Sequence, residues 1–279
     1  LKKDNYLILE TEAQGNLGWL HYPGQLRMQA FSHLASGANS VMYWHWHSIH
    51  NAIESYWKGI LSHNLKENAT YEEGSLIGQE FARYGAHLKN LQKKSPAALV
   101  VSNESLTGLQ WFSIHENLKY NDVVRWIDAL YQMNVECDIL CDTDIDRFGQ
   151  YSLLITPALY SASDKLIQAL RSFVEQGGHL FSTFKTAFSD PMLKIYHDDQ
   201  PHGLTDVFGM TYDQYTNAVN AGLQDMTFSQ DKDADHAVQY WMELLKPSTA
   251  STLASYKHPH WNAYSAVTYN HFGKGSAAY

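Results

Sequence analysis

The chain has 279 residues, of which 44% are hydrophobic and 18% charged, a composition typical of one large or two ordinary globular domains. The net charge of -9 disfavours nucleic acid or an anionic membrane as the main partner, because phosphate binding requires a basic surface. Two cysteines, Cys137 and Cys141, are too few for a disulfide-rich secreted domain, and no run of about 18 apolar residues predicts a transmembrane helix.

Apolar periodicity in the first third of the chain predicts, in order, a strand, a helix, a strand and a long helix over residues 6–10, 23–37, 39–46 and 71–91. In the first helix, Leu26, Ala30 and Leu34 share one face. A strand, a helix and a strand in this order form a βαβ unit, so the two strands are expected to pair in parallel. No signal peptide precedes the first strand, and we expect the chain to be part of a longer protein.

The polar segment "QKKSP", residues 92–96, predicts a domain boundary, with one domain over 1–92 and a second over 93–279. After it the pattern predicts strands at residues 97–102, 135–140, 151–157 and 179–184, and helices at 121–133 and 163–178. This order favours an open, mostly parallel α/β sheet. The closing segment "SAVTYNHFGKGSAAY" predicts a β-hairpin that turns at residues 272–275.

Carboxylates and tryptophans gather where the first two strands are expected to end. Glu10 ends the first apolar run, Trp46 ends the second, and Trp19 and Glu54 lie in the following loops. In a (β/α)8 barrel such strand ends carry the catalytic groups. Two carboxylates among aromatic rings suit sugar chemistry. The alternative is that Glu10 and its neighbour Glu12 are only solvated acids at a strand exit.

The histidine-rich stretch "WHWHSIHNAIE" offers possible metal ligands, but its spacing matches no closed metal motif. We therefore predict no metal and interpret these histidines as hydrogen-bonding residues of a polar rim. The second domain lacks a G-x-S-x-G nucleophile turn, a G-x-G-x-x-G motif and a phosphate-binding loop. Nothing in it predicts an enzyme or an organic cofactor.

Several stretches resemble one known family in order and spacing. "YLILETEAQGNLGW", "PGQLRMQAFSHLASGANSVMYWHWHS" and "AIESYWKGILSH" resemble the end of the catalytic (β/α)8 TIM barrel of glycoside hydrolase family 42, the β-galactosidases. "YSLLITPALY", "LRSFVEQGGHL" and "YNHFGKGSAAY" resemble that family's second domain. The resemblance implies a flavodoxin-like fold for that domain, related to class I glutamine amidotransferases without their catalytic triad, and a role in trimer assembly.

The resemblance also implies roles for individual residues. Glu10 matches the family's nucleophile, and Trp19 matches a tryptophan that lines the galactose site, in a loop one residue longer than usual. Trp46 matches the tryptophan that closes the last barrel strand. Glu54 matches the acid that binds galactose hydroxyls. The longer loop leaves Glu12 as a rival nucleophile.

Two departures from the family pattern leave the sugar specificity open. The family has Arg after the strand tryptophan, where this chain has His47, and it has His three residues after the binding acid, where this chain has Trp57. We include Trp57 among the candidate substrate-binding residues because of that position.

A retaining glycosidase needs a second carboxylic acid about 5 Å from the nucleophile. In the family this acid/base lies on the fourth barrel strand, and the resemblance places the start of this chain just before the seventh. The expected function is therefore a retaining β-galactosidase, with this chain alone inactive and no cofactor. The resemblance further implies a homotrimer in the cytoplasm. Two alternatives stay open: a non-catalytic assembly module and an amidotransferase-like enzyme in the second domain.

Overall fold

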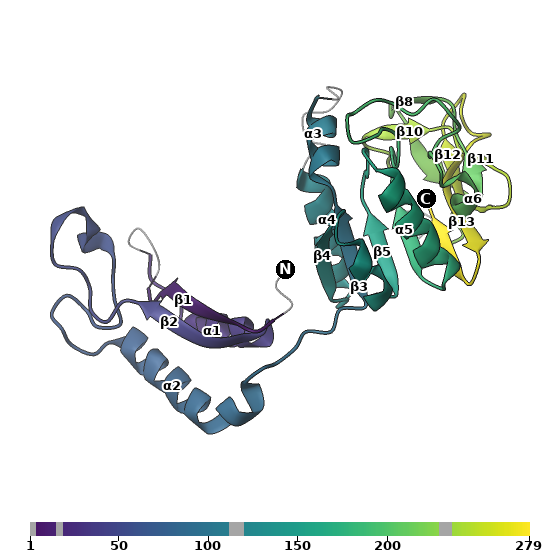
Figure 1. Cartoon of the computed structure of the whole chain (residues 1–279). Coiled ribbons are helices and arrows are strands. Elements are labelled where there is room, and N and C mark those ends of the chain that lie inside the picture. Colours follow the sequence, from purple (N-terminus) through teal and green to yellow (C-terminus); the bar gives the residue numbers. More distant parts are fainter. Residues whose placement is uncertain (1–3, 15–18, 112–119, 229–235) are drawn as a thin grey trace. The chain divides into compact units, whose positions relative to one another are not determined.

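The computed structural model describes residues 4–14, 19–111, 120–228 and 236–279. The chain divides into two compact units, Leu1–Lys94 and Ser95–Tyr279 (Figure 1). Within the described residues, no helix combines the length and the apolar character needed to cross a bilayer.

The first unit contains the expected βαβ arrangement. Strand β1 (Tyr6–Glu12) leads through helix α1 (Gln25–Ala35) into strand β2 (Ala38–Trp44), and the two strands pair in parallel. The apolar face of α1 is buried as its spacing predicts. Gly37, at a φ of +97°, ends the helix in the left-handed conformation that glycine adopts without a steric penalty.

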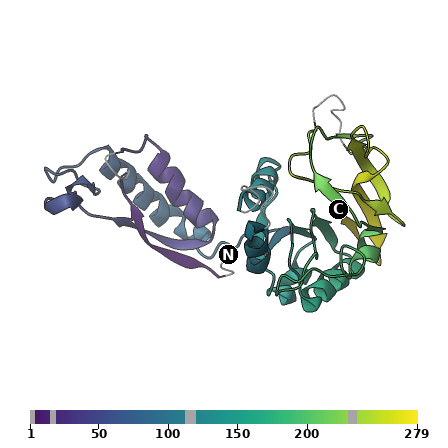
Figure 2. The same cartoon turned by 90° about the horizontal axis from the view of Figure 1, so that it is seen from above.

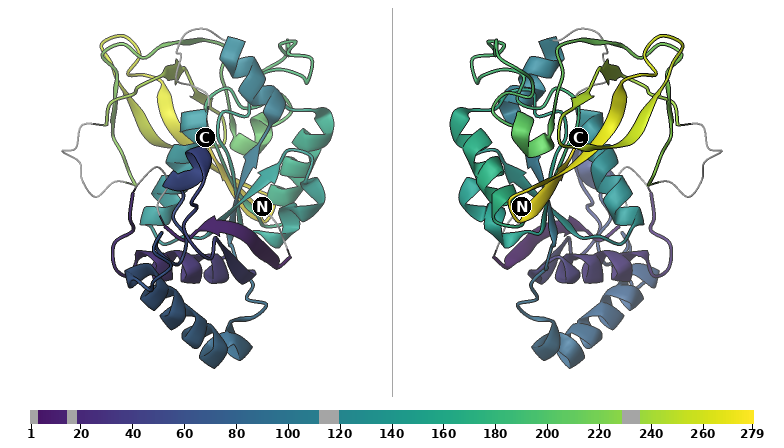
Figure 3. Two further views of the ribbon diagram at one scale, coloured as in Figure 1. Left: turned by 90° about the vertical axis from the view of Figure 1, so that its left-hand side faces the viewer. Right: turned by 90° about the vertical axis from the view of Figure 1, so that its right-hand side faces the viewer.

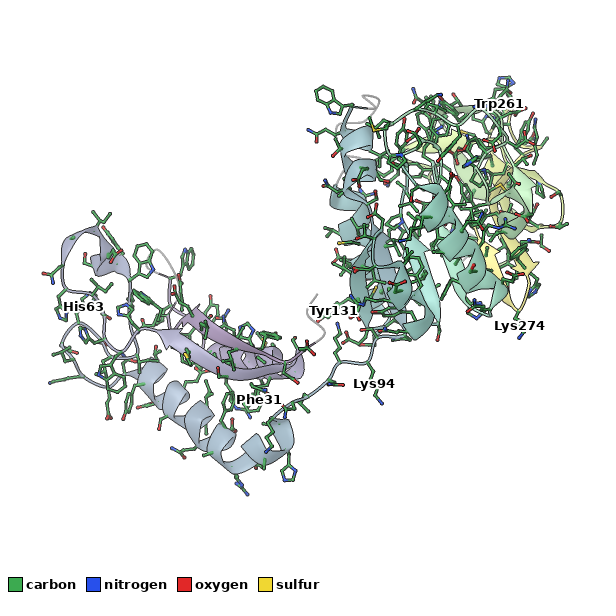
Figure 4. All side chains as sticks on the ribbon, viewed as in Figure 1. Phe31, His63, Lys94, Tyr131, Trp261 and Lys274 are labelled. Atoms are coloured by element: carbon green, nitrogen blue, oxygen red, sulfur yellow. The ribbon has the colours of Figure 1, made fainter. Side chains whose placement is uncertain are left out.

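Helix α2 (Ala69–Leu88) lies beside α1 in this unit (Figures 1 and 3). Its first turn is capped by Asn68, whose side chain accepts a hydrogen bond from the backbone N–H of Tyr71 at 3.0 Å. The ring of Phe31 on α1, which is labelled in Figure 4, meets the ring of Phe81 on α2 edge to face at 5.5 Å between centroids. Between β2 and α2 the chain forms a long loop that contains the short 3₁₀ helix η2 (Ala52–Tyr56).

The second unit is built on an eight-stranded mixed sheet in the order β4-β3-β5-β6-β14-β13-β12-β9. The bounds are β3 Ala97–Val101, β4 Cys137–Cys141, β5 Leu153–Thr156, β6 His179–Ser182, β9 Gly222–Gln224, β12 Ser251–Lys257, β13 Ser265–Phe272 and β14 Gly275–Ala278. The first five strands in the spatial order are parallel. Numbered along the chain, those five follow the order 2-1-3-4-5, which is the flavodoxin-like order that the resemblance implies.

The last three strands are antiparallel and extend the sheet beyond the flavodoxin-like part (green to yellow in Figure 2). The predicted closing hairpin is confirmed as β13 and β14. Its turn contains Gly273 at a φ of +58°, where a Cβ would lie 2.6 Å from the Cα of Glu175. Four short strands complete the unit in two antiparallel pairs: β7 Met210–Thr211 with β11 Lys246–Pro247, and β8 Tyr215–Asn217 with β10 Trp241–Glu243.

Alternate residues of the parallel strands point to opposite faces of the sheet. Both faces carry buried apolar side chains, and helices cover both of them. Helix α5 (Asp164–Glu175) packs on the face that carries Val100 and Leu154, whereas α4 (Tyr120–Gln132) packs on the face that carries Leu99 and Ile155. The remaining helices are α3 Asn103–Trp111, η3 Ile145–Gln150 and α6 Thr205–Phe208. The sequence pattern did not predict α3.

Candidate active site

Glu10 lies inside strand β1 and not at its end, which corrects the expected strand over residues 6–10. The pairing with β2 shifts at this point: Ile8 is opposite Val41 and Thr11 is opposite Tyr43, so Leu9 and Glu10 together face one residue of β2. This is the register change of a β-bulge, a feature that redirects side chains and is common beside active sites.

The Glu10 side chain is exposed at the bulge, and so is that of Leu9 beside it. The hydroxyl of the next residue, Thr11, accepts a hydrogen bond from the side-chain amide of Gln29 on α1, so Thr11 faces that helix. Glu12 differs from Glu10, because it is half-buried and lines, with Gln25 and other α1 residues, an open cavity of about 440 Å³.

The loop after β2 carries three of the remaining candidates. Trp46 is 63% exposed, and its ring meets that of Tyr71 edge to face at 6.4 Å. Glu54 lies on η2 and is exposed. Trp57 is half-buried and follows the end of η2, where its backbone N–H donates to the Glu54 carbonyl at 2.8 Å. Because β1 and β2 are parallel, this loop and the loop after β1 leave the same edge of the pair.

Trp19 follows residues 15–18, which lie outside the described part of the chain, and its side chain is 76% exposed. Among the described residues, no ring contact or hydrogen bond joins Trp19 to Glu10 or Glu54. The structure thus brings Glu54 and Trp57 into one turn. The side chains of Glu10, Trp19 and Trp46 are exposed.

The histidines of this loop hold the backbone. His47 and His50 donate ring N–H groups to the carbonyls of Ser48 and His63, at 2.9 and 2.7 Å, and the ring of His63 reaches the carbonyl of Ser55 at 3.0 Å (labelled in Figure 4). Within the described ranges, no group of three or more potential ligands is arranged to hold a metal ion. The rings of His47, His50 and His63 thus hydrogen-bond the backbone of the loop.

Sequence reasoning interpreted His45 as a hydrogen-bonding residue of a polar rim and did not predict its electrostatic coupling to Glu54. Burial is the main cause that lowers the pKa of His45, and the neighbouring His47 lowers it further, whereas Glu54 and the backbone of Trp57 act in the opposite direction. The imidazole of His45 thus lies in the electrostatic environment of the binding-acid candidate. No sequence signal indicated this, because the predicted strand ran through His45 to residue 46, whereas β2 ends at Trp44.

Sequence reasoning also missed a contact between the two loops. The side-chain amide of Gln14, which is only 7% exposed, donates a hydrogen bond to the backbone carbonyl of Gly59 at 2.7 Å. Nothing in the local pattern signals this contact, because the two residues are 45 positions apart.

Flavodoxin-like folds bind ligands at the carboxyl ends of the two strands between which the strand order reverses. In the second unit those strands are β3 and β5. The hydroxyl of Ser105 on α3 joins the segments that follow the two strands, by donating to the carbonyl of Ser161 and accepting from its N–H. The sharp turn after β5 carries Ala158 at a φ of +42°, and alanine offers no nucleophile.

Comparison with known proteins agrees with this architecture. Residues 1–84 match the family described as β-galactosidase, and residues 95–279 match the family described as β-galactosidase trimerisation domain. The β-galactosidase BgaB of Geobacillus sp. (strain Y412MC61) is 25% identical over 287 residues, which cover 100% of this chain and 42% of that protein. The β-galactosidase LacZ of Heyndrickxia coagulans is 24% identical over 293 residues, with the same two coverages.

Solved structures show the same fold. A GH42 β-galactosidase from G. stearothermophilus superposes with a TM-score of 0.86 at 19% identity, covering 100% of this chain and 41% of that one. The β-galactosidase of Bacillus circulans sp. alkalophilus gives a TM-score of 0.84 at 22% identity, covering 99% and 42%. The chain spans about 42% of the length of the curated relatives it matches. With two thirds of its residues in the trimerisation-domain match and most of the rest in the β-galactosidase match, the chain belongs to the glycoside hydrolase family 42 β-galactosidases.

Proposed function

We propose that this chain is part of a retaining β-galactosidase that hydrolyses terminal non-reducing β-D-galactosides through a covalent galactosyl-enzyme. The observation that carries the proposal is the bulge in β1, at which the Glu10 carboxylate is exposed. The loop with Glu54 and Trp57 leaves the same edge of the strand pair. The names of the curated relatives agree with this activity.

In the first step the Glu10 carboxylate attacks the anomeric carbon and forms an ester bond to it, while the glycosidic C–O bond breaks and the departing oxygen takes a proton from the acid/base. In the second step water, deprotonated by the same group, attacks that carbon and releases galactose with retained configuration. Glu10 is preferred over Glu12 because Glu12 is half-buried beside α1.

The other candidates would hold the sugar. Glu54 accepts hydrogen bonds from galactose hydroxyls, and Trp19, Trp46 and Trp57 offer aromatic faces to the apolar side of the ring. Each of these side chains is at least partly exposed within this chain. The two reaction steps need carboxyl groups and water only, so we assign no metal or organic cofactor to them.

The acid/base is assigned to a part of the barrel outside these residues, so the isolated chain is expected to be inactive. We assign residues 1–92 to the catalytic barrel and 93–279 to the trimerisation domain. The family description of residues 95–279 supports a homotrimer, which we place in the cytoplasm as the family resemblance implies. Under the alternative function, a non-catalytic oligomerisation module, the full-length protein would sediment as a trimer and would not turn over a galactoside.

The test is labelling of the full-length protein with a 2-deoxy-2-fluoro-galactoside, followed by peptide mapping. The fluorine slows hydrolysis of the covalent intermediate, so the nucleophile stays labelled. We expect turnover of a chromogenic β-galactoside and a label on Glu10. A label on Glu12 would overturn the residue assignment, and a protein with neither turnover nor label would overturn the function.

A further inference from the structure

The two loops that carry the candidate site are joined through one buried amide. Gln14 comes four residues after Glu10, and its Nε2 donates to the carbonyl of Gly59 at 2.7 Å in a buried position. Gly59 in turn comes two residues after Trp57. The backbone N–H of Ala13 continues the strand pairing by donating to the carbonyl of Trp44 at 3.0 Å. The hydrogen bond of Gln14 therefore lies next to the carboxyl ends of β1 and β2.

The backbone around Gly59 packs closely against the start of the loop after β2 and is hydrogen-bonded to it. A hydrogen bond to the Gly59 carbonyl can therefore position the whole loop. A Cβ on Gly59 would lie 2.5 Å from the carbonyl oxygen of His45, which shows how closely the returning chain passes the start of the loop. The N–H of Gly59 donates to the Ser48 hydroxyl at 3.1 Å, and that hydroxyl donates to the carbonyl of Leu61 at 3.0 Å. The N–H of Ile60 donates to the His45 carbonyl at 2.7 Å.

The start and the end of the loop after β2 are therefore hydrogen-bonded to each other around Gly59. The hydrogen bond from Gln14 connects this loop to the segment that follows β1, the strand of the proposed nucleophile. We infer that Gln14 is a positioning residue for galactoside hydrolysis, whose amide sets the placement of Glu54 and Trp57 relative to Glu10. The inference rests on the proposed function of these residues. A misplacement of about 1 Å between reacting groups can cost roughly 100-fold in rate, so one such contact is sufficient to matter.

The test uses the full-length protein with two substitutions at this position. Gln14→Leu removes the donor and leaves the buried Gly59 carbonyl without it, and we expect kcat/KM to fall about 10- to 100-fold. Gln14→Glu places a carboxylate against the carbonyl at neutral pH, but its protonated form donates as the amide does. The defect of Gln14→Glu should therefore shrink as the pH falls, relative to the pH profile of the wild type.

Rates are expressed per active site, counted by the stoichiometry of the fluoro-galactoside label, which separates misplacement from loss of folded protein. Positioning predicts full labelling, a lower kcat per labelled site and a raised KM. The matched control is Gln29→Met, which removes an amide hydrogen bond of 3.1 Å to Thr11 on the α1 side of the same strand and should leave kcat per labelled site unchanged.

The inference is overturned if both Gln14 variants keep wild-type kcat per labelled site and KM, or if Gln29→Met causes the same loss. It is also overturned if the Gln14 variants lose labelled sites while each remaining site works at the wild-type rate. The wild-type protein is measured first: absence of its turnover and label would overturn the proposed function and this inference together, whereas an active wild type with unaffected Gln14 variants overturns the inference alone.

Discussion

Lys185 and Glu243 form an ion pair in the core of the second unit. Substituting each residue in turn should change both the stability of this unit and the dependence of that stability on pH. The Lys185 Nζ lies 3.7 Å from a carboxylate oxygen of Glu243, and the two side chains are only 1% and 2% exposed. The carboxylate also accepts from the hydroxyl of Tyr279 at 2.7 Å and from the Lys185 backbone N–H at 3.0 Å. The ammonium lies 3.0 Å from the ring centre of Tyr215.

Burial penalises the charge of both groups. It lowers the pKa of Lys185 from 10.5 to about 7, with Glu243 acting in the opposite direction. It raises the pKa of Glu243, with Lys185 acting in the opposite direction. Removal of either partner therefore pushes the remaining group further towards its neutral form.

We expect Lys185→Met and Glu243→Gln each to destabilise the second unit by about 3–5 kcal/mol, because each removes the opposite charge that offsets the burial of the other group. The double variant should recover most of this loss, since no buried charge remains. For a unit of this size the single losses correspond to a fall in Tm of roughly 6–20 °C.

The two single variants should depend on pH in opposite ways. In Glu243→Gln the folded-state pKa of Lys185 falls further below its unfolded value of 10.5, so unfolding takes up a proton and stability rises with pH towards that value. In Lys185→Met the folded-state pKa of Glu243 rises further above 4.5, so folding takes up a proton and stability falls as the pH rises above 4.5.

Differential scanning calorimetry of the four proteins at several pH values between 5 and 9 measures both effects. Equal and pH-independent losses in the two single variants would refute the reasoning, because they would show that neither remaining group changes its protonation. A double variant whose loss equals the sum of the single losses would refute the coupling of the pair.

Three further outcomes are expected in the full-length protein. Glu10→Gln should lower turnover by more than about 10³-fold and abolish fluoro-galactoside labelling, and unchanged labelling would exclude Glu10 as the nucleophile. Gly59→Ala should raise KM by more than about 10-fold, because its Cβ meets the His45 backbone at 2.5 Å, whereas Gly78→Ala, with no atom within 4 Å of the new Cβ, should leave KM unchanged in the same assay. Asn68→Ala should cost about 1 kcal/mol of stability through loss of the α2 cap, measured by thermal melting, with Asn68→Asp as a control that keeps an acceptor.

Elements with strong local periodicity could be predicted from the sequence. The buried face of α5, with Leu166, Leu170 and Phe173, follows the spacing of its apolar residues, and the closing hairpin follows its glycine turn. Helix α3 was missed because Gly108 interrupts its pattern. That glycine is needed for a reason outside the helix: a Cβ there would lie 2.9 Å from the ring of Tyr160.

The sequence by itself determined which residues are candidates for the site, since carboxylates and tryptophans next to apolar runs are visible in one dimension. Only the tertiary structure decided how they are presented. The register of β1 against β2 places Glu10 in a bulge, and a bulge is a property of a pair of strands and not of one segment. The contacts of Gln14 with Gly59 and of Lys185 with Glu243 join residues 45 and 58 positions apart, and local propensity contains no information about partners at that distance, because chain folding alone brings them together.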